Sequence, residues 1–408
     1  MHVRIAFLSV SAAFGGSESV LWQLVRGMRR LARAPDCTAI VPREGVLAQR
    51  LREIGAAVRV LPMPAGLASF GEWSLRGASA AKKGAAMLSA AAWTGPYQRA
   101  LQSLLTEIDP DVIHTNGFKL HVLGSRAAPR GSAVVWHLHD YLSNRPLSRR
   151  LLRHHVSRTA AVVANSRSVA EDAQSVLGGA AHVTAVYNAV DLVEFSSSGP
   201  AADLDALSGL TPAAAGAVRV GLVATFARWK GHETFLRALA LVRTTPIRAY
   251  IVGGAVYDTA ASQYTIDELR AMAQSLGVAG RVGFTGFVDR PAEAMRALDI
   301  VVHASTDPEP FGLVVAEGLA AGRAVIVSAA GGAAELVQPD VDALTCTPGD
   351  VPALARSIDR LAGDAPLRAR LGTAARATAE RRFDADLFTH AFLDVYERVA
   401  PRSGPVAT

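Results

Sequence analysis

Two glutamates, Glu309 and Glu317, lie eight positions apart on either side of a Pro-Phe-Gly turn and an apolar run. If the chain between them were wholly helical, the two residues would be about 12 Å apart along the helix axis. That separation exceeds the roughly 5–9.5 Å between the paired carboxylates of enzymes that hydrolyse glycosidic bonds. The spacing therefore favours two contact points on one longer ligand over a hydrolytic pair.

A nucleotide sugar is a ligand of suitable length, because it carries hydroxyl groups on both sides of a diphosphate. Carboxylates accept hydrogen bonds from hydroxyls, and the amides near Phe311, Gly312 and Leu313 would face the diphosphate from the start of a helix. Pro310 belongs to the same expected substrate-binding turn. An ordinary amphipathic helix is the alternative, but it explains Glu317 poorly because an unpaired charge on an apolar segment is costly.

Two cations follow the first expected strand in the second half of the chain. Arg228 and Lys230 lie just after the apolar run 218–226, and a glycine follows the lysine. A lysine at such a strand-to-helix junction can bind a phosphate as a point charge, assisted by the helix end. A solvated surface pair is the alternative.

Gly15 and Gly16 lie directly after the first expected strand of the whole chain. Glycines let a ligand approach the backbone closely, Ser17 is expected to be the N-cap, and the following helix would aim its free amides at a phosphate. The spacing of a dinucleotide-binding loop is missing. A simple tight turn between strand and helix is the alternative.

His137 and His139 end another expected strand, and Asp140 follows them. Side chains two positions apart on a strand point to the same side, so one imidazole is expected to reach a ligand. A metal pair is weakly supported, since no third ligand follows at a fixed spacing. For each histidine alone, a purely structural role is the alternative.

Short apolar runs alternate with segments of helical period in both halves of the chain, which predicts an α/β protein with parallel, doubly wound sheets. A helix is expected at 17–33, where apolar residues recur every three or four positions. Ligands of such sheets bind beyond the carboxyl ends of the strands, where the candidate residues lie. The expected strands are 3–10, 38–42, 58–62, 111–116, 133–140, 161–166 and 182–188, then 218–226, 247–254, 282–287, 299–305, 324–330 and 343–348.

The length of 408 residues predicts two domains. We place the first domain, which is Rossmann-like, at 1–195 and the second, which is expected to bind the nucleotide sugar, at 218–382. A Ser-, Gly- and Pro-containing linker at 196–217 would join them. A terminal helix at 383–408 is expected to cross back to the first domain. Two such domains facing each other would form a central cleft.

The composition is that of a soluble globular protein, with half of the residues apolar and 19% charged. The net charge of +6 suits anionic ligands, but the lack of a dense basic block and of interleaved aromatics argues against nucleic acid. No apolar run reaches the roughly 18 residues of a membrane-spanning helix. We therefore expect a cytoplasmic protein, with Cys37 and Cys346 buried and unpaired.

These motifs together resemble the retaining glycosyltransferase family four, whose members have the two-domain GT-B fold. The resemblance rests on the E-x7-E pair within "PEPFGLVVAEGLAAGRAVIVS" and on "GGSE", "ANS", "VYNAVDLVEF", "WKGHETFLRA" and "GGAAELV", in the family's order over nearly the whole chain. It implies a hexosyltransferase that moves a sugar, with retention, from a UDP- or GDP-linked donor to a hydroxyl of a sugar, lipid-linked or small-molecule acceptor. No cofactor is expected, and no metal, because no Asp-x-Asp pair follows a strand.

The resemblance also implies roles for residues in the second half of the chain. Glu309 would contact the donor sugar, Glu317 the ribose and Lys230 the diphosphate. The family usually has a second diphosphate-binding arginine five or six positions before the lysine, where this chain has Thr225. Arg228 is the nearest basic residue and is expected to take its place.

The resemblance also implies that the first domain lies on the acceptor side. In it, the amides of Gly15 and Gly16 would contact the phosphate or the sugar. His139, with His137 as its substitute, would match the family's histidine beside the reacting sugar. By the same resemblance, Asn165 and Asn188 are substrate-binding candidates.

Three alternatives to a transferase remain open at this point: a sugar-nucleotide epimerase, a phosphorylase on the same fold, or a non-catalytic module that binds a nucleotide sugar. The missing arginine motivates the last of these. The segment 73–93 mixes basic and small apolar residues, and peripheral contact with the inner face of a membrane is a further expectation for it.

Overall fold

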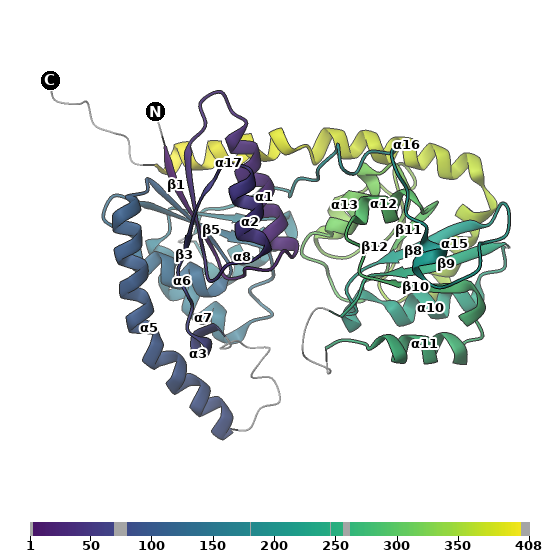
Figure 1. Ribbon diagram of the computed structural model, residues 1–408, viewed down its shortest axis with the longest axis horizontal. Helices are drawn as coiled ribbons and strands as arrows, with labels where there is room; N and C mark the ends of the chain where they lie inside the picture. Colours follow the sequence, from purple (N-terminus) through teal and green to yellow (C-terminus); the bar gives the residue numbers. More distant parts are fainter. Residues whose placement is uncertain (1–2, 69–79, 180, 245, 256–261, 401–408) are drawn as a thin grey trace. The chain divides into compact units, whose positions relative to one another are not determined.

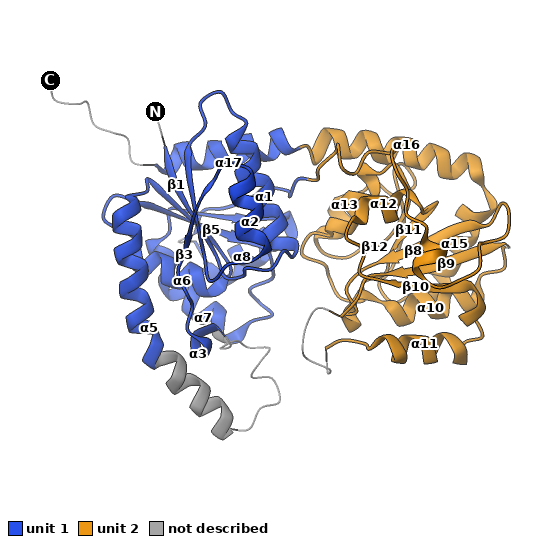
Figure 2. Ribbon diagram, viewed as in Figure 1, with its two compact units in different colours: residues 1–189, 385–408 blue, residues 190–384 orange. Residues whose placement is uncertain are grey.

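A computed structural model describes residues 3–68, 80–179, 181–244, 246–255 and 262–400 of the chain, and side chains are described outside 80–91 and 147. The chain forms two compact units (Figure 2). Unit 1 comprises Met1–Ala189 and Ala385–Thr408, and unit 2 comprises Val190–Asp384.

Unit 1 is built on a seven-stranded sheet in the order β3-β2-β1-β4-β5-β6-β7, and all of its pairings are parallel. Helices cover both faces: α1 packs against α2 and α17, whereas α6 packs against α5 and α7 (Figure 1). The strands are β1 (Arg4–Ser9), β2 (Asp36–Val41), β3 (Ala57–Val60), β4 (Val112–Asn116), β5 (Ala133–Leu138), β6 (Ala161–Ala164) and β7 (Val183–Ala185). The helices are α1 (Gly16–Arg29), α2 (Val46–Glu53), α3 (Ala65–Ala68), α5 (Ala80–Ile108), α6 (Phe118–Ala127), α7 (Pro146–His155), α8 (Arg167–Leu177) and α17 (Ala385–Val399).

Unit 2 has a second parallel sheet, of six strands in the order β10-β9-β8-β11-β12-β13. Its strands are β8 (Val218–Val223), β9 (Ile247–Val252), β10 (Val282–Gly286), β11 (Ile300–His303), β12 (Ala324–Ser328) and β13 (Leu344–Cys346). Its helices are α9 (Leu204–Leu207), α10 (His232–Leu241), α11 (Ile266–Ser275), α12 (Pro291–Arg296), α13 (Leu313–Ala320), α14 (Gly332–Glu335), α15 (Val351–Gly363) and α16 (Ala365–Arg382). The predicted class, two Rossmann-like parallel-sheet domains, is confirmed.

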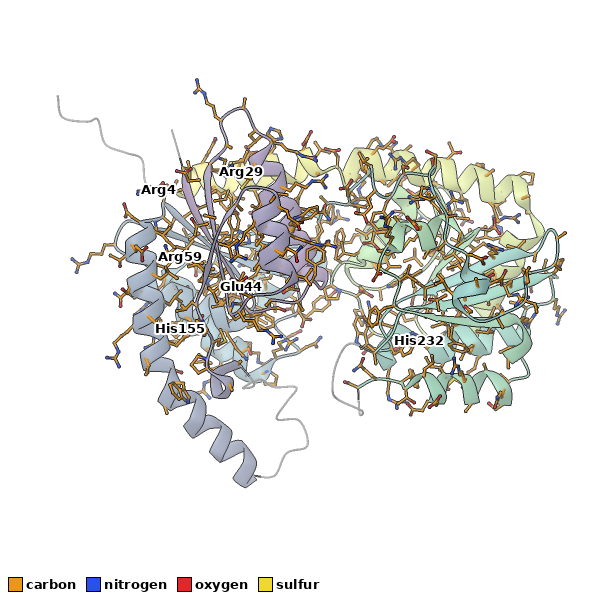
Figure 3. All side chains as sticks on the ribbon, viewed as in Figure 1. Arg4, Arg29, Glu44, Arg59, His155 and His232 are labelled. Carbon is orange, nitrogen blue, oxygen red and sulfur yellow. The ribbon has the colours of Figure 1, made fainter. Side chains whose placement is uncertain are left out.

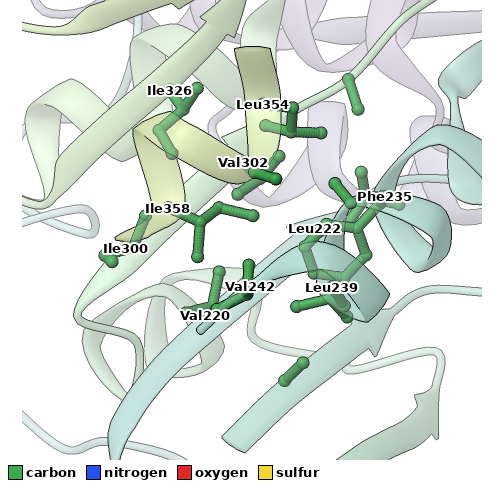
Figure 4. Close-up of a cluster of buried hydrophobic side chains, with 14 of the residues drawn as sticks. Val220, Leu222, Phe235, Leu239, Val242, Ile300, Val302, Ile326, Leu354 and Ile358 are labelled. Carbon is green, nitrogen blue, oxygen red and sulfur yellow. The ribbon is translucent and has the colours of Figure 1, made fainter. Parts of the chain in front are cut away.

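The core of unit 2 explains why its strands appear in the sequence as unbroken apolar runs. Every residue of β11 and β12 is buried, because helices cover both faces of a parallel sheet. On one face, Leu222 of β8 and Val302 of β11 belong to the same buried cluster as Phe235 of α10 and Ile358 of α15 (Figure 4).

The division between the units differs from the predicted boundaries. The segment expected to be a linker, 196–217, lies within unit 2, because it supplies its own buried contacts. Asp205 of α9 is only 3% exposed, accepts a hydrogen bond from the Tyr250 hydroxyl at 2.8 Å and forms an ion pair with Arg219. Because residues of the sheet pair with the buried carboxylate of Asp205, helix α9 is part of unit 2, which begins at Val190.

The C-terminal segment returns to unit 1. Helix α16 belongs to unit 2, whereas α17 belongs to unit 1 and packs against α1. Phe392 and Tyr396 of α17 are both buried. Gly27 of α1 lies so close that an added Cβ would meet the Thr389 hydroxyl at 2.0 Å. The fit of a glycine against α17 shows how tightly the returning helix is packed.

Other expectations concern single segments. Cys37 and Cys346 are both buried and free, as predicted. Within the described ranges, no helix combines the length and the apolar character needed to cross a membrane. Of the segment 73–93, residues 73–79 lie outside the described residues, and the side chains of 80–91 are likewise outside the description.

Candidate functional site

The strand order of unit 2 locates a crevice at the carboxyl end of its sheet. Strand β8 lies between β9 and β11, so the connections after β8 and after β11 leave toward opposite sides. Such a switch point is where doubly wound sheets bind ligands. Lys230 follows β8 and Glu309 follows β11, and the Thr306 amide donates to the Trp229 carbonyl at 2.8 Å, which joins the two loops.

Lys230 and Glu309 meet at this switch point. The Lys230 Nζ atom lies 2.5 Å from Glu309 Oε1, and the side chains of the two residues are 18% and 10% exposed. The Glu309 backbone is fixed as well, because its carbonyl accepts the Gly332 amide at 2.7 Å. The structure therefore brings together two of the residues that the sequence singled out from positions 79 residues apart.

The second oxygen of the Glu309 carboxylate is held by residues that sequence reasoning missed. His303 Nε2 lies 2.9 Å from Glu309 Oε2, and the Ser305 hydroxyl donates to the same oxygen at 2.8 Å. The Ser305 carbonyl in turn accepts the Ser328 hydroxyl at 2.5 Å. His303 is the last residue of β11, and Ser305 follows two positions later. Side chains two positions apart on a strand point to the same side, and this spacing could have identified the two residues from the sequence.

These partners determine the charge of Glu309. Burial alone would raise the pKa of its carboxyl group, but the Lys230 ammonium and the His303 hydrogen bond hold that pKa well below its usual range. The carboxylate is therefore ionised at neutral pH. Because a carboxylate only accepts hydrogen bonds, the proton of the His303 ring lies on Nε2.

Glu317 lies on α13 in a different environment. It is half-buried, and no hydrogen bond or ion pair holds its carboxylate within the described part of the chain. Burial, with a smaller contribution from the nearby Glu194 charge, raises the pKa of Glu317 to about 8. A half-buried acidic group without a partner is costly to the fold, which favours a role in binding.

The turn before α13 has the geometry expected of a helix start. Gly312 is the N-cap residue with φ +97°, a conformation that favours glycine, and Leu313 is the first residue of the helix. Phe311 is 3% exposed and packs edge-to-face on Phe383. Pro310 is half-buried. This turn presents backbone rather than side chains, and the side chain of Phe311 anchors it.

Arg228 does not join Lys230 and Glu309. Its guanidinium forms an ion pair with Glu268 at 2.9 Å and lies over the Tyr264 ring, 4.3 Å from the ring centroid. Tyr264 lies just before α11, and Glu268 is the third residue of that helix. In this structure Arg228 therefore contacts Glu268 and Tyr264. That Arg228 replaces the family arginine remains a prediction.

A pocket of about 400 Å³ lies at the carboxyl ends of β8, β9 and β10 and was not predicted. Its lining is mainly apolar or backbone: Phe226, Gly253, Gly254, Ala255, Gln263, Tyr264, Thr265, Ile266, Gly286 and Phe287. A Cβ on Gly253 would lie 2.0 Å from the Ala224 carbonyl oxygen, so only glycine fits there. The glycines directly after β9 and at the end of β10 were the sequence signal. Nearby, His232 is fully buried at the start of α10 (Figure 3).

Unit 1 has its own switch point between β1 and β4, and Gly15 and Gly16 follow β1 there. Both glycines are exposed. The expected N-cap is wrong: Gly15 is the N-cap residue of α1, and the Ser17 hydroxyl donates to the Glu18 carboxylate at 2.9 Å instead. The N-cap thus lies two residues before the expected one, and α1 spans Gly16–Arg29 in place of the expected 17–33.

His139 lies just past β5 and is half-buried. Its Nε2 atom lies 2.8 Å from Oδ1 of Asn116, a residue at the end of β4 that sequence reasoning missed. Burial lowers the pKa of His139 to about 4, so the imidazole is neutral at physiological pH.

His137 is placed differently from His139, although their rings are only 4.0 Å apart. It is fully buried between the rings of His114 and Phe392. The expectation that His137 could substitute for His139 is therefore wrong, since its ring has no access to a ligand.

Asn165 and Asn188 are both buried in unit 1, at 3% and 2% exposure. Their Oδ1 atoms have no hydrogen-bond partner among the described residues. Buried acceptors without a partner are uncommon in folded proteins. Their role in binding stays a prediction. No cluster of three or more metal-ligating side chains occurs among the residues described.

Two family models match the chain in succession. The model described as Glycosyltransferase Family 4 matches residues 14–194, and the model described as Glycosyl transferases group 1 matches residues 214–378. The matches correspond to the two units and contain Gly15, Gly16 and His139 on one side and Lys230, Glu309 and Glu317 on the other.

Curated relatives match over part of their length. A D-inositol 3-phosphate glycosyltransferase of Xylanimonas cellulosilytica is 33% identical over 60% of this chain and 59% of its own, and the lipopolysaccharide core biosynthesis glycosyltransferase LpsD of Rhizobium meliloti is 32% identical over 51% and 57%. The chain thus spans less than two thirds of these relatives.

Solved structures match over nearly the full length. HepE of Anabaena, in complex with UDP-glucose, is 28% identical with a TM-score of 0.78, covering 97% of this chain and 100% of HepE. Sucrose-phosphate synthase of Thermosynechococcus elongatus shares the fold at 20% identity, with a TM-score of 0.75 over 97% and 98%. The chain therefore belongs to glycosyltransferase family four and has the GT-B type of fold.

Proposed function

We propose that this protein transfers a sugar from a nucleoside-diphosphate sugar to a hydroxyl group of an acceptor. The observation that carries the proposal is the buried ion pair between Lys230 and Glu309 at the switch point of unit 2. Glu317, eight residues after Glu309, adds a second carboxyl group, which has no partner among the described residues. Lys230 can bind an anion, and the carboxyl groups of Glu309 and Glu317 can accept hydrogen bonds from hydroxyls. Together they suit a ligand with hydroxyls on both sides of a diphosphate.

In this proposal the donor lies along the carboxyl edge of the sheet. Lys230 binds the diphosphate, Glu309 accepts from the sugar hydroxyls and Glu317 accepts from the ribose. The pocket lined by Phe226 and Phe287 is large and apolar enough for a nucleobase. HepE is described in complex with UDP and UDP-glucose. A UDP-linked sugar is thus the first donor to test, followed by a GDP-linked one.

The chemistry follows from where charge develops. The bond between the anomeric carbon and the phosphate oxygen breaks, the acceptor oxygen forms the new bond, and the acceptor proton passes to the departing diphosphate. Negative charge grows on that leaving group, and a preplaced ammonium and helix-start amides stabilise it. We propose that the reaction retains the anomeric configuration and uses neither a metal ion nor another cofactor, because Lys230 supplies the positive charge.

The acceptor is proposed only by class: a hydroxyl of a sugar, a lipid-linked glycan or a small molecule. His139, neutral and hydrogen-bonded to Asn116, is the proposed contact of unit 1 with the reacting sugar. LpsD is named for lipopolysaccharide core biosynthesis, which makes lipid-linked glycans the first acceptors to test.

A panel of nucleotide sugars tests the donor site. A ligand that binds only the folded protein raises its melting temperature, so one UDP- or GDP-linked sugar is expected to do so and to release nucleotide when an acceptor is added. The Glu309→Gln variant, which keeps the size of the side chain but loses its charge, is expected to lose both effects. If no nucleotide sugar shifts the wild-type protein, the proposal fails.

A second candidate function is a binding module that retains the nucleotide sugar without transferring it. It is favoured by Thr225 at the position of the family's arginine and by the pairing of Arg228 with Glu268. Donor binding by calorimetry, with no nucleotide release across a broad acceptor panel, would support this candidate. Conversion of the donor without any acceptor would instead indicate an epimerase, and phosphate-dependent cleavage a phosphorylase.

A further inference from the structure

Helix α7 of unit 1 presents a strongly basic face to solvent. Arg149, Arg150, Arg153 and His154 are exposed, and Leu151 at the flank of the same face is 51% exposed. The opposite face holds Leu152 at 0% and packs toward α6 and α8. Figure 3 labels His155, the last residue of the helix.

Some surface arginines of the chain are neutralised by acidic side chains. Arg52 pairs with Glu44, and Arg59 pairs with Glu107. In contrast, no acidic side chain pairs with the arginines of α7 or with the exposed Arg158, which follows in the turn Val156–Arg158, as far as the chain is described. Their charge is therefore available to an external partner.

Helix electrostatics explains only part of this arrangement. Basic side chains near the end of a helix are stabilised by the partial negative charge of the last turn, which accounts for Arg153 and His154. Arg149 lies in the first half of the helix, and Arg158 lies beyond its end. The helix dipole therefore does not account for the positions of Arg149 and Arg158.

We propose that this surface, the basic face of α7 (Arg149, Arg150, Leu151, Arg153, His154 and Arg158), docks the protein on an anionic lipid membrane. Helices with an arginine-rich face and an apolar flank bind at the boundary between lipid headgroups and acyl chains. A cluster of four arginines is within the range that binds anionic lipid, since each basic residue near the surface adds to the attraction. The exposed Leu151 supplies an apolar anchor. The face has no Phe, Tyr or Trp on which nucleic acid bases would stack.

The position of α7 gives the docking a consequence for unit 1. The helix is joined to β5 by the loop 139–145, which begins at His139. The loop is held in place by the ion pair between Arg145 and Asp140 and by the Leu142 amide, which donates to Asp172 at 2.6 Å. A docked α7 would therefore keep the strand end that carries His139 close to the lipid surface, where a lipid-linked acceptor would be.

Vesicle flotation with the full-length protein, without any donor, tests the docking separately from the transferase proposal. The probes are vesicles of phosphatidylcholine alone and vesicles that also contain phosphatidylglycerol. We expect flotation only with the anionic vesicles, and its loss at high salt because exposed charges are screened. The triple variant Arg149→Glu, Arg150→Glu, Arg153→Glu is expected to reduce partitioning by roughly tenfold or more.

A control variant has the same change in net charge, but its substitutions lie outside α7. Arg33→Glu, Arg43→Glu, Arg130→Glu reverses three exposed arginines in turns and loops of unit 1, and it should float within about twofold of the wild type. Thermal melting of both variants confirms that each is folded. The proposal is overturned if the wild type stays in the soluble fraction with anionic vesicles, if the α7 variant floats as well as the wild type, or if both triple variants lose binding equally. Binding of RNA in place of vesicles would likewise contradict it.

Discussion

Lys230 and Arg228 are two positions apart in one short turn, yet they have different partners. Lys230 pairs with Glu309 at the switch point, and Arg228 pairs with Glu268. We expect Lys230→Met to lower kcat/KM by about 10²- to 10³-fold, the usual effect of removing one group that stabilises developing negative charge. Arg228→Met should lower it by less than about tenfold, because a partly exposed ion pair contributes little. Nucleotide release under limiting donor gives both values.

Melting temperatures serve as the control for this pair, since neither cation lies in a hydrophobic core. Equal losses of kcat/KM in the two variants would contradict the assignment. That result would mean that Arg228 leaves Glu268 to bind the diphosphate, as the family resemblance implies.

His303 is a positioning residue for Glu309, which it contacts at Oε2. We expect His303→Leu to weaken donor binding, because the buried carboxylate loses one of its hydrogen bonds. The same change should raise the pKa of Glu309 and so move the acid limb of the activity profile to higher pH. His303→Gln, whose amide can donate to the same oxygen, should restore most of both. A profile that is unchanged in His303→Leu would remove this role.

Among the site residues, those in recognisable sequence segments could be predicted. Residues whose importance depends only on a contact with another side chain were missed. Glu309 and Lys230 each follow a strand at the switch point, so their placement followed from pattern and strand order. Ser305 contacts Glu309 four residues further along its own loop, and Asn116 contacts His139 at the end of another strand. Such contacts depend on side-chain geometry that a periodic pattern does not encode.

Helix α13 carries a cost to stability at Glu317. The pKa of this residue is raised from about 4.5 to about 8, so between these values the unfolded chain is ionised while the folded chain holds the proton. The free energy of unfolding therefore falls as the pH rises through this range and levels off above it. We expect Glu317→Gln to raise the melting temperature by a few degrees at pH 9, with little change at pH 5, and to weaken donor binding at both.

Thermal melts of both proteins across this pH range measure the effect, and calorimetry with the donor measures binding. A variant that is stabilised but no longer binds would show that the carboxyl group is retained for function. If Glu317→Gln is less stable than the wild type at pH 9, the buried carboxyl has a partner that stabilises its charge and the argument is wrong.

Among the elements, the strands could be predicted and the short helices could not. Strands of a parallel sheet are buried on both faces, so each appears in the sequence as an apolar run between polar segments. Helix α9 has only four residues within a Ser-, Gly- and Pro-rich stretch, too few for a helical period to be visible. Its membership in unit 2 depends on Asp205, whose partners Tyr250 and Arg219 lie on strands of the sheet.

For the whole molecule, the buried histidines set the response to acid. Burial lowers the pKa of His114 to about 3, of His139 to about 4 and of His232 to about 4. Burial, followed by repulsion from the His139 ring, lowers the pKa of His137 well below its usual value. An unfolded histidine takes up a proton below about pH 6.5. The unfolded chain therefore binds more protons than the folded chain between about pH 6.5 and pH 4, and stability falls as the pH falls.

Most of these histidines belong to unit 1, where His114 and His137 lie against α17, so acid should destabilise that unit first. The His114 ring and the Tyr396 hydroxyl share a hydrogen bond of 2.6 Å. In the part of the chain that the structure describes, neither ring nitrogen of His137 has a hydrogen-bond partner. We expect denaturant titrations to give a lower free energy of unfolding at pH 5 than at pH 7, and hydrogen exchange in β4 and β5 to accelerate first. His137→Leu removes one titrating group without breaking a hydrogen bond, and it should flatten this pH dependence. Equal stability of the wild type at the two pH values, or an unchanged slope in His137→Leu, would show that the returning helix does not keep these imidazoles neutral.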